Sequence, residues 1–240
     1  MFGTMADNAL YIMDALPEAS NLAELSLKAL KHVFVAKPGT MNLEQIRFLK
    51  KLADESGVVL QLGTGYKFCP VYKTLIESAQ TARVVDVKFQ MESACNLKFE
   101  LFCIFDFVTN ILNVNIVKID VKSWKNAENT PDVFHYAVGC DNGSMINITA
   151  YKVAEGEPKL EVTFVTPETV IFADIFKSII TKHDRSSNLS DNMILEAYCE
   201  KTVNDSYLQN FRHAIEKDGN AIQTIDKHLQ NIISSFELLS

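Results

Sequence analysis

The first third of the chain alternates short apolar runs with longer segments in which apolar residues recur every three or four positions. The runs at 9–13, 32–35 and 58–62 predict buried strands, and the segments at 20–31 and 42–56 predict helices between them. Because these strands are apolar throughout rather than alternating, we expect a parallel sheet that is covered on both faces.

The second of these helices also carries signals for its two ends. Asn42 precedes it and Gln45 follows three residues later, which is the pattern of a capping box. Gly57 comes directly after its last turn, where glycine commonly ends a helix. Residues 70–79 predict one further helix.

Beyond Arg83 the pattern changes to alternation of apolar and polar residues, which is typical of strands with one exposed face. The triplet Asp141-Asn142-Gly143 predicts a tight hairpin between two of them. The segments that predict this mainly antiparallel sheet are 85–91, 116–124, 133–139, 145–151 and 159–164. Helical spacing is found at 98–113, 190–202, 204–217 and 221–239, and the polar segment 182–190 predicts a surface loop.

These patterns predict a fold of class α/β plus α+β, in two domains. Residues 1–82 should form a partial Rossmann-type domain around the parallel sheet. Residues 83–240 should form an open, mainly antiparallel sheet with helices on one face, and the terminal helices should return to the first domain.

Composition and charge exclude several classes of protein. The 240 residues carry a net charge of -7, and an acidic chain without basic runs has no field that attracts nucleic acid or anionic membranes. No apolar stretch is long enough to span a membrane, and residues 1–5 have neither the basic nor the long apolar region expected of a signal peptide. The cysteines form no CxxC pair and the histidines no HExxH motif, so we expect reduced thiols, no metal site and a cytoplasmic location.

Candidate chemistry lies where the predicted parallel strands end. Ligands of open parallel sheets bind outside the carboxyl ends of the strands, and here these ends are the segments 14–17, 36–40 and 63–67. Parallel neighbours bring such loops to one rim of the sheet. We therefore expect Lys37 and Lys67 to lie near one cleft.

Four segments carry a resemblance to a known family. Residues 32–38 read HVFVAKP, where the family has a strand ending in Glu-Lys-Pro, and residues 63–70 read GTGYKFCP, similar to its Gly-His-x-x-Arg-Phe-x-Pro. Leu16-Pro17 resembles its Thr-Pro entry to a helix, and residues 103–107 lie where it carries His-x-x-Asp-Leu. Over nearly its whole length the chain resembles the Gfo/Idh/MocA oxidoreductases, named after glucose–fructose oxidoreductase and inositol dehydrogenase.

The resemblance implies hydride transfer between NAD or NADP and a hydroxyl of a sugar or cyclitol, in a homo-oligomer built through the C-terminal sheet. It implies that Lys37 and Asp106 are the catalytic residues, and that Lys67 and Cys103 contact the substrate. The residues that it implies for cofactor binding are Leu16, Pro17, Lys37, Pro38, Thr64 and Gly65.

The chain also departs from the family pattern. It has no GxGxxG turn, whose backbone N–H groups bind the pyrophosphate, and it begins at what should be the family's fourth strand, so we expect the first two βα units to be missing. Ala36 stands in place of the glutamate and Cys103 in place of the histidine. We therefore expect an oxidoreductase-family protein with impaired cofactor binding and little or no activity, or alternatively a non-catalytic binding or oligomerisation module.

Each candidate residue also has a plain structural interpretation. Lys37 is equally consistent with a solvated lysine after a strand, and Lys67 with an ordinary surface charge. Asp106 could be a helix carboxylate with a backbone partner, and Cys103 a small residue of an apolar helix. Residues 64–65 could form a simple turn between a strand and a helix.

Overall fold

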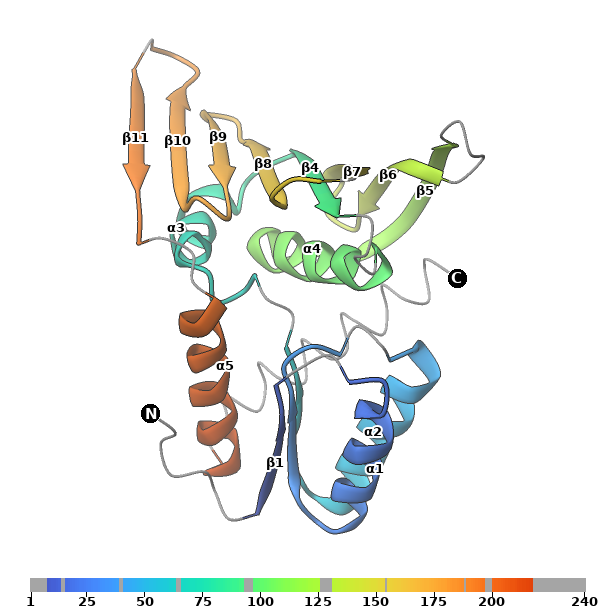
Figure 1. Ribbon diagram of the computed structural model, residues 1–240. Coiled ribbons are helices and arrows are strands. Elements are labelled where there is room, and N and C mark those ends of the chain that lie inside the picture. Colours follow the sequence, from blue (N-terminus) through green and yellow to red (C-terminus); the bar gives the residue numbers. More distant parts are fainter. Residues whose placement is uncertain are drawn as a thin grey trace. The chain divides into compact units, whose positions relative to one another are not determined.

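The structure is a computed structural model (Figure 1). It describes residues 8–13, 16–38, 41–63, 66–92, 97–125, 131–153, 155–187, 189–196 and 200–217. The chain forms two compact units. The first comprises residues 1–65, 101–106 and 200–240, and the second comprises residues 66–100 and 107–199. The predicted division after residue 82 stays a prediction.

The first unit is built on a parallel sheet of the order β1-β2-β3. Its strands are β1 (Ala9–Ile12), β2 (His32–Val35) and β3 (Leu60–Leu62), and they are joined by α1 (Ala19–Lys28) and α2 (Leu43–Ser56). Both helices lie on the same face of the sheet (Figure 1). The strands and helices predicted for this part of the chain are therefore confirmed, with the expected parallel pairing.

A helix from the other end of the chain covers the second face of this sheet. It is α5 (Glu200–Ile215), which lies on the side opposite to α1 and α2 (Figure 1). Phe34 of β2 contacts two aromatic rings of this helix, with centroid distances of 5.7 Å to Phe211 and 6.4 Å to Tyr207. Burial on both sides explains why β2 has no alternation of polar and apolar residues.

The core between the sheet and the first two helices is wholly apolar. The buried side chains of α1 and α2 recur at helical spacing and meet the strands, and with them they form one cluster: Ile12, Ala19, Ala23, Leu27, Val33, Val35, Ile46, Leu49, Ala53, Leu60 and Leu62. The two ends of α2 are those predicted. The Asn42 side chain accepts from the Gln45 N–H, the Gln45 side chain accepts from the Asn42 N–H, and Gly57 adopts a left-handed conformation with φ of 65°.

The second unit is an open sheet of eight strands in the order β11-β10-β9-β8-β4-β7-β6-β5. Only β4 and β7 pair in parallel, and all other neighbours are antiparallel. Two helices, α3 (Pro70–Ala79) and α4 (Leu97–Leu112), lie on one face of this sheet (Figure 1). The strands are β4 (Val84–Glu92), β5 (Ile116–Lys125), β6 (Pro131–Cys140), β7 (Met145–Val153), β8 (Lys159–Val165), β9 (Thr169–Asp174), β10 (Ile179–Asp184) and β11 (Ser190–Ile194).

The predicted fold class is confirmed, since a small parallel sheet is followed by a larger, mainly antiparallel one with helices on one face. The hairpin is confirmed as well: Asp141–Gly143 joins β6 to β7, and Gly143 has φ of 81°. Its geometry is held by the Ser144 N–H, which donates to Asn142 Oδ1 at 2.9 Å.

Three strands at one end of the large sheet were not predicted. β9 was not recognised, β10 extends into the segment predicted as a loop, and β11 occupies the start of the predicted helix 190–202. The apolar residues of that segment have helical spacing, but antiparallel pairing with β10 decides its conformation. Helix α5 is continuous from Glu200 to Ile215, and the predicted helix at 221–239 lies outside the described residues.

Candidate functional site

The carboxyl ends of the three parallel strands lie at one level. Ile12, Val35 and Leu62 are register partners across the sheet. One residue further, the Ala36 N–H donates to the Ile12 carbonyl at 2.8 Å and the Gly63 N–H donates to the Val35 carbonyl at 2.7 Å. The loops that follow these strands therefore start from one rim of the sheet, which is the place where open parallel sheets bind ligands.

The described residues of these loops differ in exposure. Leu16 is half-buried and Pro17 is exposed after β1, and Lys37 is exposed while Pro38 is buried after β2. Thr64 and Gly65, the cofactor residues implied after β3, lie outside the described residues. Lys37 thus has the exposure that a ligand contact requires, and the roles of all these residues stay predictions.

The rim is tight where β2 and β3 end, at Ala36 and Gly63. A Cβ atom placed on Gly63 would lie 2.5 Å from the Ala36 carbonyl oxygen, closer than any side chain can approach a backbone atom. Glycine is therefore required at this position by the neighbouring strand end. This close approach gives Gly63 a structural role, independent of any ligand.

The N-termini of the first two helices are poorly suited to a phosphate. In α2 the side chains of Asn42 and Gln45 form a capping box, so its first N–H groups already have partners. Helix α1 begins after Glu18, whose carboxylate side chain makes no capping hydrogen bond and carries the same charge as a phosphate. Neither of these two helix starts therefore combines free N–H groups with a favourable charge for the pyrophosphate of a dinucleotide.

Asp106 and Cys103 both lie on the buried stretch of α4. Asp106 is 1% exposed and Cys103 is 3% exposed, within an unbroken run of buried residues from Leu101 to Thr109. A carboxyl group at this depth needs hydrogen-bond partners, as buried polar groups generally do. Cys103 carries no imidazole, so this position lacks the side chain that most often acts as a general base near neutral pH.

In the second unit, Lys67 is buried with only 8% of its surface exposed, which is incompatible with an ordinary surface charge. Its neighbour Tyr66 donates a hydrogen bond to Glu100 Oε2 at 2.8 Å. Burial raises the pKa of the Glu100 carboxyl, and the hydrogen bond from Tyr66 acts in the opposite direction but is outweighed. The Tyr66 ring is held edge-on by Phe107 and Phe176, at centroid distances of 6.2 and 6.0 Å.

Sequence reasoning did not identify the Tyr66–Glu100 pair, because its members are separated by a helix and a strand. The only local signal is that Tyr66 follows Gly65 directly, at the end of the third strand segment. Segment 63–70 therefore contributes a second polar side chain besides Lys67, namely Tyr66, which binds the Glu100 carboxyl.

The described cysteines with shifted acidity are poor nucleophiles. Burial raises the pKa of Cys69 to about 12, and burial together with Asp141 raises the pKa of Cys140 to about 11. The described residues contain no cluster of histidine, cysteine and carboxylate side chains suited to a metal ion. Within the same residues, no helix is long and apolar enough to cross a membrane.

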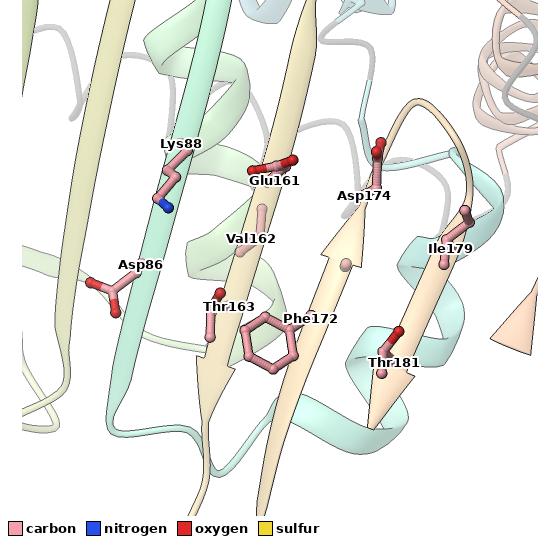
Figure 2. A pocket seen from close by; sticks show the side chains of 10 residues that line it. Asp86, Lys88, Glu161, Val162, Thr163, Phe172, Asp174, Ile179 and Thr181 are labelled. Atoms are coloured by element: carbon pink, nitrogen blue, oxygen red, sulfur yellow. The ribbon is translucent and has the colours of Figure 1, made fainter. Parts of the chain in front are cut away.

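A groove of about 310 Å³ lies on the large sheet, on the face away from α3 and α4 (Figure 2). Residues of β4, β8, β9 and β10 line it. The Phe172 ring lies beside Thr163 of the neighbouring strand β8 (Figure 2). Its polar lining residues are Asp86, Lys88, Glu161, Thr163, Asp174 and Thr181. Because they alternate with buried residues along separate strands, only the strand pairing brings them together.

Charged side chains form one cross-strand row across this groove. Lys88 of β4 is the register partner of Glu161 of β8, and Glu161 is the partner of Asp174 of β9. Lys177 forms a salt bridge of 3.1 Å with Asp174, which offsets the repulsion between the two adjacent carboxylates. The neighbouring carboxylates raise the pKa of the Lys177 ammonium, Asp174 most of all.

Comparison with known proteins gives structural relatives only. No family model matches the sequence, and no curated protein matches it. The solved structure of UDP-N-acetylglucosamine 3-dehydrogenase GnnA from Acidithiobacillus ferrooxidans superimposes with a TM-score of 0.73 at 17% identity, over 97% of this chain and 80% of that one. A dehydrogenase from Chromobacterium violaceum superimposes with a TM-score of 0.79 at 13% identity, over 97% of this chain and 74% of that one.

A candidate myo-inositol dehydrogenase from Sinorhizobium meliloti gives a TM-score of 0.73 at 15% identity, covering 96% of this chain and 76% of that chain. The chain has the Gfo/Idh/MocA-type fold. The resemblance read from the four sequence segments is thereby confirmed at the level of the fold, since identities this low establish no more than architecture.

Proposed function

We propose that this Gfo/Idh/MocA-fold chain binds a sugar-like or cyclitol ligand beside the carboxyl ends of β1, β2 and β3, and that its own binding of NAD or NADP is impaired. The main support for this proposal comes from the N-termini of α1 and α2, which are poorly suited to a phosphate. The capping box at Asn42 occupies the N-terminus of α2 and the carboxylate of Glu18 opposes a phosphate at the start of α1, whereas the strand ends lie at one level and bear the exposed Lys37.

In this proposal Lys37 and Asp106 are the polar residues retained from an oxidoreductase site. Lys37 donates to ligand hydroxyl groups, and Asp106 is the retained acidic member of the site, buried in α4. Lys67 and Cys103 belong to the substrate part, and Leu16, Pro17, Pro38, Thr64 and Gly65 to the part that faces a nicotinamide in a complete enzyme. With Cys103 in place of a histidine, the imidazole base is missing there, and losing a general base costs a factor of about 10²–10⁴ in rate.

The alternative is a non-catalytic binding or oligomerisation module of the same fold. The open face of the large sheet supports it, because Trp124 and Phe172 are exposed there at 52% and 45%. The row that contains Glu161 and Asp174 continues across the sheet to Lys122 of β5. Each member of this row is the register partner of the next, from β9 through β8, β4, β7 and β6 to β5. A second copy related by a two-fold axis would set Lys122 against these carboxylates, which makes the face self-complementary.

The deciding experiment is titration of the purified chain with NADH and NADPH, followed by nicotinamide fluorescence and by calorimetry. The proposal expects no binding of either dinucleotide up to millimolar concentration. It expects measurable heat from UDP-N-acetylglucosamine or myo-inositol, the two ligand types suggested by the structural relatives. Micromolar binding of NADH or NADPH would contradict the proposal and assign a dehydrogenase site to this chain.

A pair of lysine variants tests where the sugar-like ligand binds. Lys37→Ala should weaken its binding by about tenfold, which is the loss of one hydrogen bond to a charged group. Lys51→Ala is the matched control, because Lys51 is an exposed lysine on α2, away from the strand ends, with 75% of its side chain exposed. If both variants bind the sugar-like ligand with equal affinity, Lys37 does not contact it.

A further inference from the structure

The two edges of the eight-stranded sheet differ in their protection against further strands. The edge strand β5 carries three lysines, at 118, 122 and 125, and has register shifts near both ends. Lysines and bulges on an edge strand prevent another strand from pairing with it. The opposite edge, β11, has neither lysine nor proline and pairs with β10 without a register shift.

Every residue of β11 is exposed, and the exposed side chains include large apolar ones. Leu189, Met193 and Ile194 are 73%, 40% and 78% exposed. No described strand lies beyond β11 at this end of the sheet (Figure 1). An exposed, regular edge with apolar side chains is a template for one more strand.

The hydrogen bonds to β10 show which backbone groups of β11 remain available. The Leu189 carbonyl accepts from the Asp184 N–H at 3.2 Å, and the Leu195 N–H donates to the Ser178 carbonyl at 2.9 Å. Because such bonds alternate along an antiparallel pair, the odd-numbered residues from 189 to 195 face β10. Ser190, Asn192 and Ile194 therefore direct their backbone N–H and C=O groups away from the sheet.

The side chains along this segment are arranged symmetrically about Asn192. In an antiparallel pairing of two copies centred on this residue, Leu189 meets Leu195 of the other copy, Ser190 meets Ile194 and Asp191 meets Met193. Asn192 then pairs with itself, so that the even-numbered residues with free backbone groups all pair with one another. No like charges oppose each other in this register, whereas a register centred on Asp191 would set two carboxylates face to face.

We propose that β11 is the contact between two copies of this chain, joined edge to edge by antiparallel pairing about a two-fold axis at Asn192. The backbone N–H and C=O groups of Ser190, Asn192 and Ile194 of each copy form the hydrogen bonds between the two strands. The apolar side chains at both ends of the strand pack against those of the other copy. The partner is a second copy rather than a foreign peptide because the pattern of the strand complements itself. The association is independent of ligand binding and of any contact through the open face of the sheet.

The test uses sedimentation velocity of the full chain and of three variants at residue 192. Asn192→Pro removes the outward N–H and leaves the bonds to β10 intact, since proline is tolerated where the N–H of an edge strand faces solvent. Asn192→Lys sets two lysines against each other across the two-fold axis. Asn192→Ala is the matched control, because it keeps the backbone ladder. Circular dichroism verifies that all variants fold.

The expected result is that the proline and lysine variants sediment with half the mass of the wild type, while the alanine variant associates like the wild type. A wild type that stays monomeric at every concentration would overturn the proposal. So would a proline variant that stays associated while Phe172→Lys, on the open face, dissociates, because the interface would then be the face and not the edge. Dissociation of all three variants at 192 alike would also overturn it, since the ladder would then not be the contact.

Discussion

Gln61 of β3 donates from Nε2 to the backbone carbonyl of Tyr207 on α5, at 3.3 Å, across 146 residues of sequence. Asn210, one turn further along the helix, donates to Gln61 Oε1 at 3.4 Å. Gln61 is 2% exposed, so this amide is a polar contact inside an otherwise apolar layer. It fixes the position of the C-terminal helix along the strand, in addition to the ring contacts of Phe34.

We expect Gln61→Ala to lower the free energy of unfolding by about 1–3 kcal/mol, because it leaves the Asn210 amide without its acceptor and opens a small cavity. Urea denaturation followed by circular dichroism measures this loss. Gln80→Ala, at an exposed position after α3, is the matched control and should change stability by less than about 0.5 kcal/mol. Equal stability of the two variants would show that the contact to α5 is not formed.

The close approach at Gly63 predicts intolerance to any side chain. Gly63→Ala should cost about 1–3 kcal/mol or more, since the added Cβ meets the Ala36 carbonyl oxygen, a backbone atom that cannot move by itself. Gly139→Ala is the control on another strand, because its nearest neighbour would be 3.9 Å away. Thermal unfolding of both variants measures the loss of stability. If Gly63→Ala is as stable as Gly139→Ala, the close approach between Gly63 and the Ala36 carbonyl does not exist.

The capping box of α2 predicts a measurable loss on removal of Asn42. Asn42→Ala should destabilise the chain by about 1 kcal/mol, which is the usual loss when a capping side chain is removed. Asn42→Asp should retain the cap, because aspartate accepts the same hydrogen bond. If the cap excludes phosphate from this helix end, Asn42→Ala should acquire measurable affinity for inorganic pyrophosphate in a calorimetric titration, whereas Asn42→Asp should not. Absence of binding by both variants would show that the cap is not what excludes phosphate.

The Tyr66–Glu100 pair predicts a pH dependence of stability. Because the folded state raises the pKa of Glu100, this carboxyl stabilises the fold in its protonated form, and that contribution is lost as the pH rises through the raised pKa. Glu100→Gln keeps a neutral acceptor for Tyr66 and cannot ionise. Its stability relative to the wild type should therefore increase between acidic and neutral pH.

Urea denaturation of the wild type and Glu100→Gln at several pH values measures this difference. Tyr66→Phe removes the hydrogen bond that lowers the carboxyl pKa, so its stability should fall at a higher pH than that of the wild type. A difference between wild type and Glu100→Gln that is the same at every pH would show that Glu100 has an ordinary pKa.

Local patterns determined much of the architecture. The parallel strands were predicted from their continuous apolar runs, and the ends of α2 were predicted from Asn42 and Gly57. The β6–β7 hairpin was predicted from residues 141–143. Each of these features depends on the preferences of neighbouring residues. The resemblance to the Gfo/Idh/MocA fold also followed from short segments of sequence, and the solved structures agree with it.

Other features exist only because distant segments meet. β11 has the apolar spacing of a helix and becomes a strand through its pairing with β10. The burial of Lys67 and the half-buried position of Glu100 cannot be read from the residues beside them. The groove on the large sheet likewise combines side chains of four strands. The sequence by itself determined the local elements and the residue types at the strand ends. Which of those residues are buried, paired or exposed was decided by the tertiary structure, because burial and pairing depend on contacts between residues far apart in the chain.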